Sequence, residues 1–207
     1  MKTVGITGPS GSGKSLLCET LRQRDIPCID ADRVYHSLLI PPSSCLDALR
    51  ANFGDGVFCA DGSLDRAALG AIVFADGEKL KLLNSTVLGF VLVRIRELIA
   101  DYVSQGYSVV AVDAPTLIES GFNKECDIVV SVVACEQVRI ERIMARDSIT
   151  LERATQRTRA QKSEDFYSAH SDYMIENNGS STELTQKIEK LFADGVFDST
   201  EGDDEKN

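Results

Sequence analysis

The chain has 207 residues, 43% of them hydrophobic, and a formal net charge of −10 at pH 7. This length can bury the core of one α/β domain with a small inserted subdomain. No apolar run approaches the roughly 20 residues that cross a bilayer, and the first residues enter a strand without a signal-peptide pattern, so we expect a cytoplasmic protein without membrane contacts. The acidic balance without a basic patch disfavours nucleic acid as a partner.

Short apolar runs alternate with helical periodicity along the chain. The runs predict a five-stranded parallel sheet with strands at Thr3–Ile6, Pro27–Ile29, Val109–Val112, Ile128–Val133 and Tyr173–Ile175. Helical patterns cover 13–24, 78–105, 136–146 and 181–192, the last with Ser180 and Glu183 at capping-box spacing. The predicted fold is a doubly wound α/β domain over residues 1–193.

Two segments depart from this alternation. The interval between the second and third strands is too long for one crossover and is broken at 41–44 and 60–63, so we expect residues 33–105 to be a helical insertion that binds an acceptor. From Asp194 onward the sequence DGVFDSTEGDDEKN contains six acidic residues and one lysine. Such a polar segment is typical of disorder, which we predict for residues 194–207.

The cysteines occur without C-x-x-C pairs or His-rich clusters, at positions 18, 28, 45, 59, 126 and 135. This spacing argues against both a zinc site and a disulfide framework. We interpret most of them as small buried apolar side chains.

A glycine-rich motif follows the first predicted strand. Residues 5–17, GITGPSGSGKSLL, hold Gly8, Gly13, Lys14 and Ser15 in the order G-x-x-x-x-G-K-S. Glycines allow the backbone N–H groups to turn inward toward anionic oxygens, and a following helix adds the positive end of its dipole. Lys14 could reach the β- and γ-phosphates, and the Ser15 hydroxyl could hold Mg²⁺. The alternative is a glycine-rich turn that only caps a helix.

Acidic residues follow two other predicted strands. Asp30 and Asp32 come after the second strand, at the sheet edge where ligands of parallel sheets bind. A carboxylate there could accept a hydroxyl proton or hold metal-bound water, although Asp32 could also simply cap a helix that begins at Arg33. Asp113 ends the strand VVAVD and is typical of the acid that binds Mg²⁺ through water, but a strand-ending turn explains it equally well.

Arginines are concentrated between residues 139 and 161. Arg142 and Arg146 lie four residues apart on one helical face, and Arg157 falls on a second helix. Such arginines could neutralise a transferring phosphoryl group while a hinged helical pair, a lid over residues 142–165, excludes water. The alternative is a solvated helix surface with glutamate partners at 141 and 152.

Taken together, these stretches resemble the dephospho-coenzyme A kinase family over residues 3–192. The resemblance is carried by GITGPSGSGKS, IDADRV, GSLDRAALGAIVF, VDAPTLIE, RIERIMARD, Arg157 to Gln161 and SDYMIENNGS. It implies a nucleotide-kinase fold with a phosphate loop, and transfer of the ATP γ-phosphoryl group to the ribose 3′-hydroxyl of dephospho-coenzyme A.

By matched position, the resemblance implies roles for individual residues. Asp32 is the expected general base, and Arg66 matches an arginine near the acceptor. ATP would be bound by Gly8, Gly11, Ser12, Gly13, Lys14, Ser15 and Leu16, with Mg²⁺ held by Ser15 and Asp113. Arg142 would reach the phosphates from the lid side, with Arg146 and Arg157 as further lid arginines.

The sequence departs from the family pattern at three places. A His-Pro pair usual in the family is replaced by Leu88 and Gly89, so any acceptor contact of that histidine is absent. Thr116 stands for a usual leucine and Leu16 for a commoner threonine, and neither change removes a catalytic atom. His36 and His170 lie in helical surroundings typical of surface or packing residues.

Two other functions are compatible with parts of the pattern. A nucleoside monophosphate or shikimate kinase would share the phosphate loop and lid but lacks this combination of DAD and LDR motifs. A nucleotide-dependent switch protein could use the acidic tail to bind partners, but the sequence contains no N-K-x-D motif.

Overall fold

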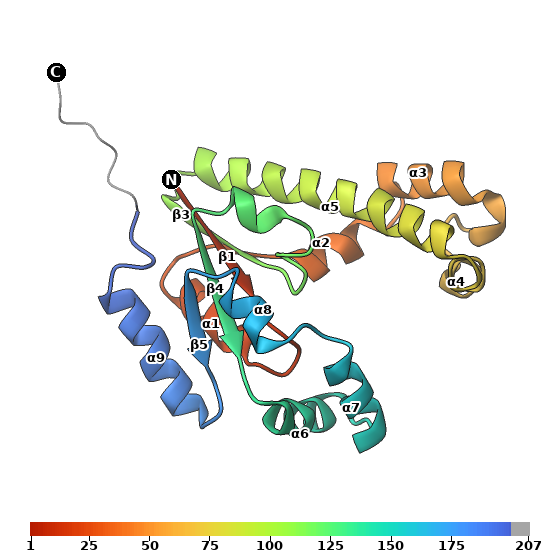
Figure 1. The fold of residues 1–207 in the computed structure, drawn as a ribbon. Helices are drawn as coiled ribbons and strands as arrows, with labels where there is room; N and C mark the ends of the chain where they lie inside the picture. The colour runs from red at the N-terminus through yellow and green to blue at the C-terminus, as the bar shows by residue number, and fades with distance from the viewer. Residues whose placement is uncertain (200–207) are drawn as a thin grey trace. The chain divides into compact units, whose positions relative to one another are not determined.

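The computed structural model describes residues 1–199. As predicted, it contains an all-parallel five-stranded sheet (Figure 1). The order of the strands is β2-β3-β1-β4-β5. The strands are β1 (Lys2–Thr7), β2 (Cys28–Asp30), β3 (Val109–Asp113), β4 (Ile128–Val133) and β5 (Tyr173–Glu176). In register, Ile6 of β1 pairs with Asp113 of β3, and Thr7 pairs with Ser131 of β4.

The helices fall close to their predicted positions. They are α1 (Lys14–Gln23), α2 (Ala31–Leu38), α3 (Ser44–Phe53), α4 (Arg66–Ala75), α5 (Gly77–Ser104), α6 (Glu136–Asp147), α7 (Leu151–Arg159), α8 (Glu164–Ser168) and α9 (Ser181–Ala193), with short 3₁₀ turns at Asp55–Val57 and Phe122–Glu125. The capping box at the start of α9 forms between Ser180 and Glu183. None of the helices within residues 1–199 is long and apolar enough to cross a membrane.

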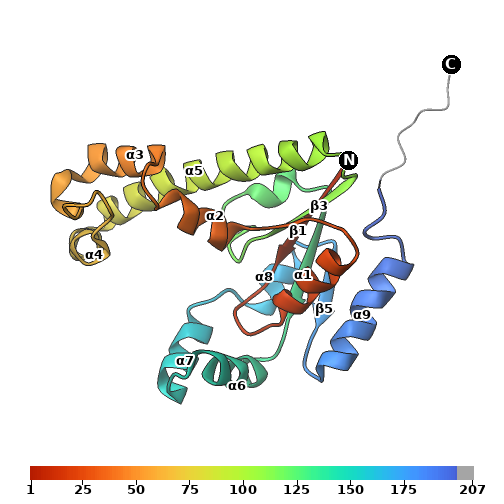
Figure 2. The ribbon, with the colours of Figure 1, turned by 180° about the vertical axis from the view of Figure 1, so that it is seen from behind.

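Successive side chains along each strand point to opposite faces of the sheet, and different helices cover the two faces. Val4, Ile6, Val130 and Val132 are fully buried in one core with residues of α1 and α9, which lie side by side in Figure 2. Val133, one residue further along β4, packs on the opposite face against Tyr167 of α8. Burying each such aliphatic side chain contributes roughly 1.5–3 kcal/mol. Helices therefore cover both faces, and the predicted doubly wound α/β class is confirmed.

Packing divides the described residues into two units, residues 1–29 with 101–199, and residues 30–100. The second unit is helical and has its own small cores. Leu39, Cys45, Leu46 and Leu49 form one cluster, and Val57, Leu69 and Val73 form another. The predicted break at 60–63 is a tight turn, and the residues on either side of it, Phe58 and Leu64, form an isolated antiparallel bridge.

The segment after α9 differs from the prediction. Val196 and Phe197 are 2% and 3% exposed, and the Phe197 ring lies 4.6 Å from that of Phe192. Gly195 has φ 71°, which lets the chain turn back and places these two apolar side chains on the main core. The prediction of disorder from Asp194 is therefore wrong for residues 194–199, because the polar average hid two apolar anchors. Residues 200–207 lie outside the described part.

The six cysteines are all free thiols. Cys18 and Cys45 are buried as predicted, and burial raises the pKa of the half-buried Cys126 to about 12. Cys28 is half-buried like Cys126, and Cys59 and Cys135 are exposed, so the interpretation of most of the cysteines as buried apolar side chains is wrong.

Candidate active site

The glycine-rich segment between β1 and α1 adopts a conformation that requires its glycines. Gly8, Gly11 and Gly13 have φ values of 137°, 80° and 104°. A Cβ atom at Gly8 would overlap the carbonyl oxygen of Val132, and one at Gly11 would lie 2.8 Å from the carbonyl oxygen of Arg139. The loop thus packs its backbone tightly against β4 and α6 before α1 begins. The N-terminus of α1 carries the positive end of the helix dipole and is therefore suited to anionic oxygens.

We expect Gly8→Ala to destabilise the protein by more than about 3 kcal/mol, because left-handed strain adds to a clash with immobile backbone. Gly121→Ala is the matched control, since Gly121 has φ 79° but open space around its Cα. That control should lower the free energy of unfolding by only about 1–2 kcal/mol, the contribution of backbone strain alone. Urea unfolding of both variants measures the difference, and equal losses would contradict the close packing described for Gly8.

Lys14 and Ser15 are the first two residues of α1. The Lys14 ammonium donates to the carbonyl oxygens of Gly8 at 2.6 Å and Pro9 at 3.4 Å, so the side chain curls over its own loop. Asp113 is half-buried at the carboxyl end of β3, paired with Ile6 two residues before the loop. The Ser15 hydroxyl and the Asp113 carboxylate are hard oxygen donors, which fits a divalent cation such as Mg²⁺.

Arg142 of α6 and Asn177, which follows β5, hold the phosphate loop from outside. The Arg142 guanidinium donates to the carbonyl oxygens of Asn177 at 3.0 Å and Gly179 at 3.1 Å, with longer bonds to those of Gly11 at 3.4 Å and Ser12 at 3.5 Å. The buried Asn177 amide donates to the Ser12 carbonyl at 2.7 Å. By binding these carbonyls, the two side chains fix the outer side of the loop.

Sequence reasoning did not single out Asn177. The signal was available, because the sequence ENNG follows the fifth strand and therefore emerges at the edge of the sheet where ligands bind. The structure engages Arg142 with backbone carbonyls, whereas the sequence prediction directed it to phosphate.

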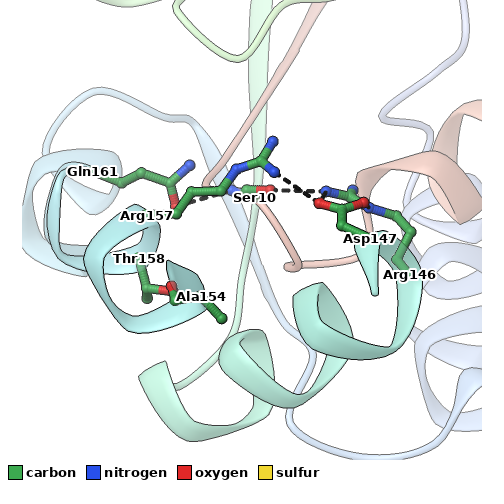
Figure 3. A network of polar contacts seen from close by, with 7 residues as sticks. All are labelled: Ser10, Arg146, Asp147, Ala154, Arg157, Thr158 and Gln161. Carbon is green, nitrogen blue, oxygen red and sulfur yellow. Dashed lines mark hydrogen bonds and ion pairs between the residues drawn. The ribbon is translucent and has the colours of Figure 1, made fainter. Parts of the chain in front are cut away.

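The other two predicted lid arginines meet at one carboxylate (Figure 3). Asp147, the last residue of α6, accepts hydrogen bonds from Arg146 and from Arg157 of α7. The hydrogen bond from Arg146 is the main cause that lowers the pKa of the Asp147 carboxyl below its usual value. The alternative of glutamate partners at 141 and 152 is not what the structure shows for these two arginines, and Asp147 was missed in the sequence.

Asp30 and Asp32 lie at different positions at the start of α2. The helix begins at Ala31, and the Asp30 side chain caps it by accepting from the Arg33 N–H at 3.0 Å. The sequence alternative, in which Asp32 caps a helix starting at Arg33, is therefore wrong. Asp32 lies in the first turn with an exposed side chain.

Arg66 is the first residue of α4, directly after the Asp65 cap, and it is exposed. It lines a cavity of about 280 Å³ that lies wholly within the helical unit. The remaining wall is mostly apolar, with Tyr35, Leu69, Val73 and Leu83 among the lining residues. This combination suits a ligand with an apolar arm and an anionic group.

The departures from the family pattern have modest local consequences. Leu88 and Gly89, which stand where a His-Pro pair was expected, lie inside α5, which continues without a break for 28 residues. A proline there would remove a helical hydrogen bond. His170 packs its ring 4.8 Å from that of Phe166 and contacts the carbonyl oxygen of the same residue, and His36 is exposed on α2.

These features together define a phosphate-loop kinase. A glycine-rich loop leads from β1 of the parallel sheet into α1, Lys14 and Ser15 begin that helix, and arginine-bearing helices lie beside the loop. Comparisons with known proteins give the particular kind. The family model for dephospho-CoA kinase matches residues 2–183. The chain belongs to the dephospho-CoA kinase family, and it is accordingly an ATP-binding transferase of coenzyme A synthesis.

Individual relatives agree with this assignment. A dephospho-CoA kinase of Anaeromyxobacter dehalogenans is 36% identical over 194 residues, covering 94% of this chain and 92% of the relative. One from Symbiobacterium thermophilum is 35% identical and covers 93% and 80%, respectively. Among solved structures, dephospho-CoA kinase from Campylobacter jejuni superposes with a TM-score of 0.69 at 23% identity, covering 94% of this chain and 96% of that one.

Shikimate kinase from Acinetobacter baumannii superposes less well, with a TM-score of 0.51 at 17% identity and 94% coverage of both chains. This similarity supports the fold and does not bear on the acceptor. Because the matching family model and the named relatives are dephospho-CoA kinases, the comparisons favour that function over the shikimate, nucleoside monophosphate and switch-protein alternatives.

Proposed function

We propose that this protein transfers the γ-phosphoryl group of ATP to the ribose 3′-hydroxyl of dephospho-coenzyme A, in one in-line step without a phosphoenzyme, giving coenzyme A and ADP. Family membership supports the substrates. The observation that carries the chemical assignment is the capping of α2 by Asp30, which leaves the exposed Asp32 carboxylate available as a base.

In this proposal the phosphate loop binds ATP. Backbone N–H groups between Gly11 and Leu16 bind the phosphates, and the positive φ angles of the loop glycines make that arrangement possible. Lys14, now bonded to the Gly8 and Pro9 carbonyls, exchanges those partners for phosphate oxygens. Kinases that use ATP require a divalent metal, which we propose to be Mg²⁺. Ser15 and Asp113 would hold it, and when bound it would neutralise phosphate charge.

Asp32 removes the proton from the 3′-hydroxyl as the oxygen attacks phosphorus. Arg146 and Arg157 stabilise the charge of the transferring group, and α6 and α7 act as the lid predicted over residues 142–165. A phosphate contact by Arg142 and a cytoplasmic location of the protein stay predictions.

In this proposal the acceptor binds in the helical unit. The apolar cavity beside Arg66 suits the long, mostly uncharged arm of dephospho-coenzyme A, and the Arg66 guanidinium suits its pyrophosphate. The missing His-Pro pair removes one acceptor contact expected from the family, so Arg66 gains importance for acceptor affinity.

We expect Arg66→Gln to raise the KM for dephospho-coenzyme A roughly 10- to 100-fold and to leave the KM for ATP within twofold, because only a charge-assisted contact to the acceptor is lost. Lys79→Gln is the control, since Lys79 is exposed in the same unit and does not line the cavity. Steady-state kinetics with each substrate varied measures the effect. An equal rise in both KM values would contradict an acceptor-specific role.

The proposed activity is tested by coupling ADP release to a spectrophotometric assay with dephospho-coenzyme A, shikimate and nucleoside monophosphates as acceptors. We expect ADP release with dephospho-coenzyme A and with none of the other acceptors. We also expect ³¹P NMR to show a product that carries a 3′-phosphate. Tight ATP binding without transfer to any of these acceptors would refute the proposal and favour a switch protein.

A further inference from the structure

Asp147 occupies an unusual place between two arginines of the lid helices. Its Oδ1 atom accepts from the Arg146 Nε group at 2.7 Å, and its Oδ2 atom accepts from the Arg146 Nη2 group at 2.9 Å. The same Oδ2 atom accepts from the Arg157 Nη1 group at 2.7 Å. One carboxylate thus joins the end of α6 to α7 (Figure 3).

This cluster also contacts the phosphate loop. The Arg146 Nη2 group donates to the Ser10 hydroxyl at 3.3 Å, and the Ser10 N–H donates to the Gln161 amide oxygen at 3.2 Å. Gln161 in turn accepts from the Arg139 Nη1 group at 3.0 Å. In Figure 3 the Arg146 and Arg157 side chains converge on Asp147 beside Ser10. The arginines are therefore held next to the loop that we propose to bind ATP.

The backbone brings these groups together. Ser148, with φ 53° and ψ 39°, ends α6 in the left-handed region and turns the chain toward α7. Ile140 and Ile143 of α6 pack with the buried Ala154 of α7. This small core fixes the two helices against each other, so that residues ten apart in sequence, Asp147 and Arg157, can pair.

Stability is a weak explanation for the cluster. The side chains of Arg146 and Arg157 are 55% and 50% exposed, and that of Asp147 is 26% exposed. Exposed ion pairs of this kind add little to folding stability because solvent screens them. Their effect on orientation is larger, since a carboxylate paired with the planar guanidinium fork restricts a side chain that is otherwise highly flexible.

We propose that Asp147 is a positioning residue that holds Arg146 and Arg157 in place for the γ-phosphoryl group, an inference that rests on the proposed function. Without the carboxylate, the two guanidinium groups would repel each other at this separation. With it, they share one counter-charge and keep further N–H donors for phosphate. Within residues 1–199, Asp147 accepts hydrogen bonds from the Nη1 group of Arg157 and from the Nε and Nη2 groups of Arg146. It makes no bond to the Nη1 group of Arg146 or to the Nε and Nη2 groups of Arg157.

The test compares Asp147→Asn with the control Glu152→Gln. Glu152 is an exposed acidic residue in the first turn of α7. Asp147→Asn should lower kcat roughly 10- to 100-fold, because misplaced charge-stabilising groups lose transition-state contacts. The KM for dephospho-coenzyme A should stay within twofold, and Glu152→Gln should match the wild type. The melting temperature should fall by no more than about 3 °C.

A background without the arginines separates positioning from other roles. In Arg146→Gln/Arg157→Gln, adding Asp147→Asn should change kcat less than twofold, because no guanidinium remains to be positioned. A full further loss in this background would overturn the proposal. So would a tighter affinity of Asp147→Asn for ATP, since Asp147 would then be competing with phosphate for the arginines.

Calorimetric titration with AMP-PNP keeps this inference separate from the proposed activity, because it needs no acceptor. We expect Asp147→Asn to bind AMP-PNP at least threefold more weakly than the wild type and Glu152→Gln to bind it equally well. Wild-type protein that binds AMP-PNP in this pattern but makes no coenzyme A would refute the proposed function alone. An active wild type with unchanged AMP-PNP affinity and kcat in Asp147→Asn would refute the positioning role alone.

Discussion

Lys14→Ala is expected to lower kcat with dephospho-coenzyme A by at least about 10²- to 10³-fold. Removing one preorganised charge from a phosphoryl-transfer site has a cost of this order, because that charge stabilises the negative oxygens of the transition state. The Nζ atom now lies 2.6 Å from the Gly8 carbonyl oxygen, and a truncated side chain cannot provide the charge in either position. The measurement is coupled ADP release at saturating ATP and acceptor.

Lys14→Met is the matched control for shape. It keeps most of the aliphatic stem over the loop and removes the ammonium, so it should be as inactive as Lys14→Ala if charge is the cause. Thermal unfolding of both variants checks that the fold is retained. Wild-type turnover in either variant would mean that residues 8–15 do not serve as a phosphate loop in catalysis.

Asp32→Asn should lower kcat roughly 10²- to 10⁴-fold, the range attributable to general base catalysis. Asparagine has nearly the same shape but cannot accept the hydroxyl proton. The affinity for AMP-PNP should stay within twofold, because Asp32 is assigned to the acceptor reaction and not to nucleotide binding. Steady-state kinetics and calorimetric titration provide the two measurements.

Asp30→Asn is the control two residues away. Asp30 caps α2 through the Arg33 N–H, and asparagine is as good a capping residue as aspartate. This variant should therefore keep both stability and turnover within about twofold of the wild type. If Asp30→Asn were the inactive variant and Asp32→Asn the active one, the base would be Asp30 and our assignment of the two carboxylates would be reversed.

The phosphate loop and the sheet could both be predicted from the sequence. Apolar runs of three to six residues between helical patterns predicted the parallel strands, because a strand buried on both faces needs apolar side chains at consecutive positions. The G-x-x-x-x-G-K-S spacing predicted the loop, since glycine alone tolerates the φ values of 80° to 137° found there. Both signals are local, so neither needed knowledge of distant contacts.

Composition was a poorer guide at the end of the chain. Averaged over residues 194–207 the sequence is polar and acidic, yet Val196 and Phe197 are buried in the main core. Two apolar residues are enough to dock a short segment when a glycine lets the chain turn back. That outcome depends on whether the core offers a place for them, which an average over a window does not contain.

By itself, the sequence determined the fold class, the phosphate loop and the kinase family, because these depend on periodicity, spacing and backbone conformation within short segments. Only the tertiary structure decided which side chains pair around the loop: that Asp30 and not Asp32 caps α2, that Asn177 and Arg142 bind the loop carbonyls, and that Asp147 joins Arg146 to Arg157. Such pairings depend on atoms from elements far apart in the chain coming within about 3 Å, a condition set by packing and not by any local pattern.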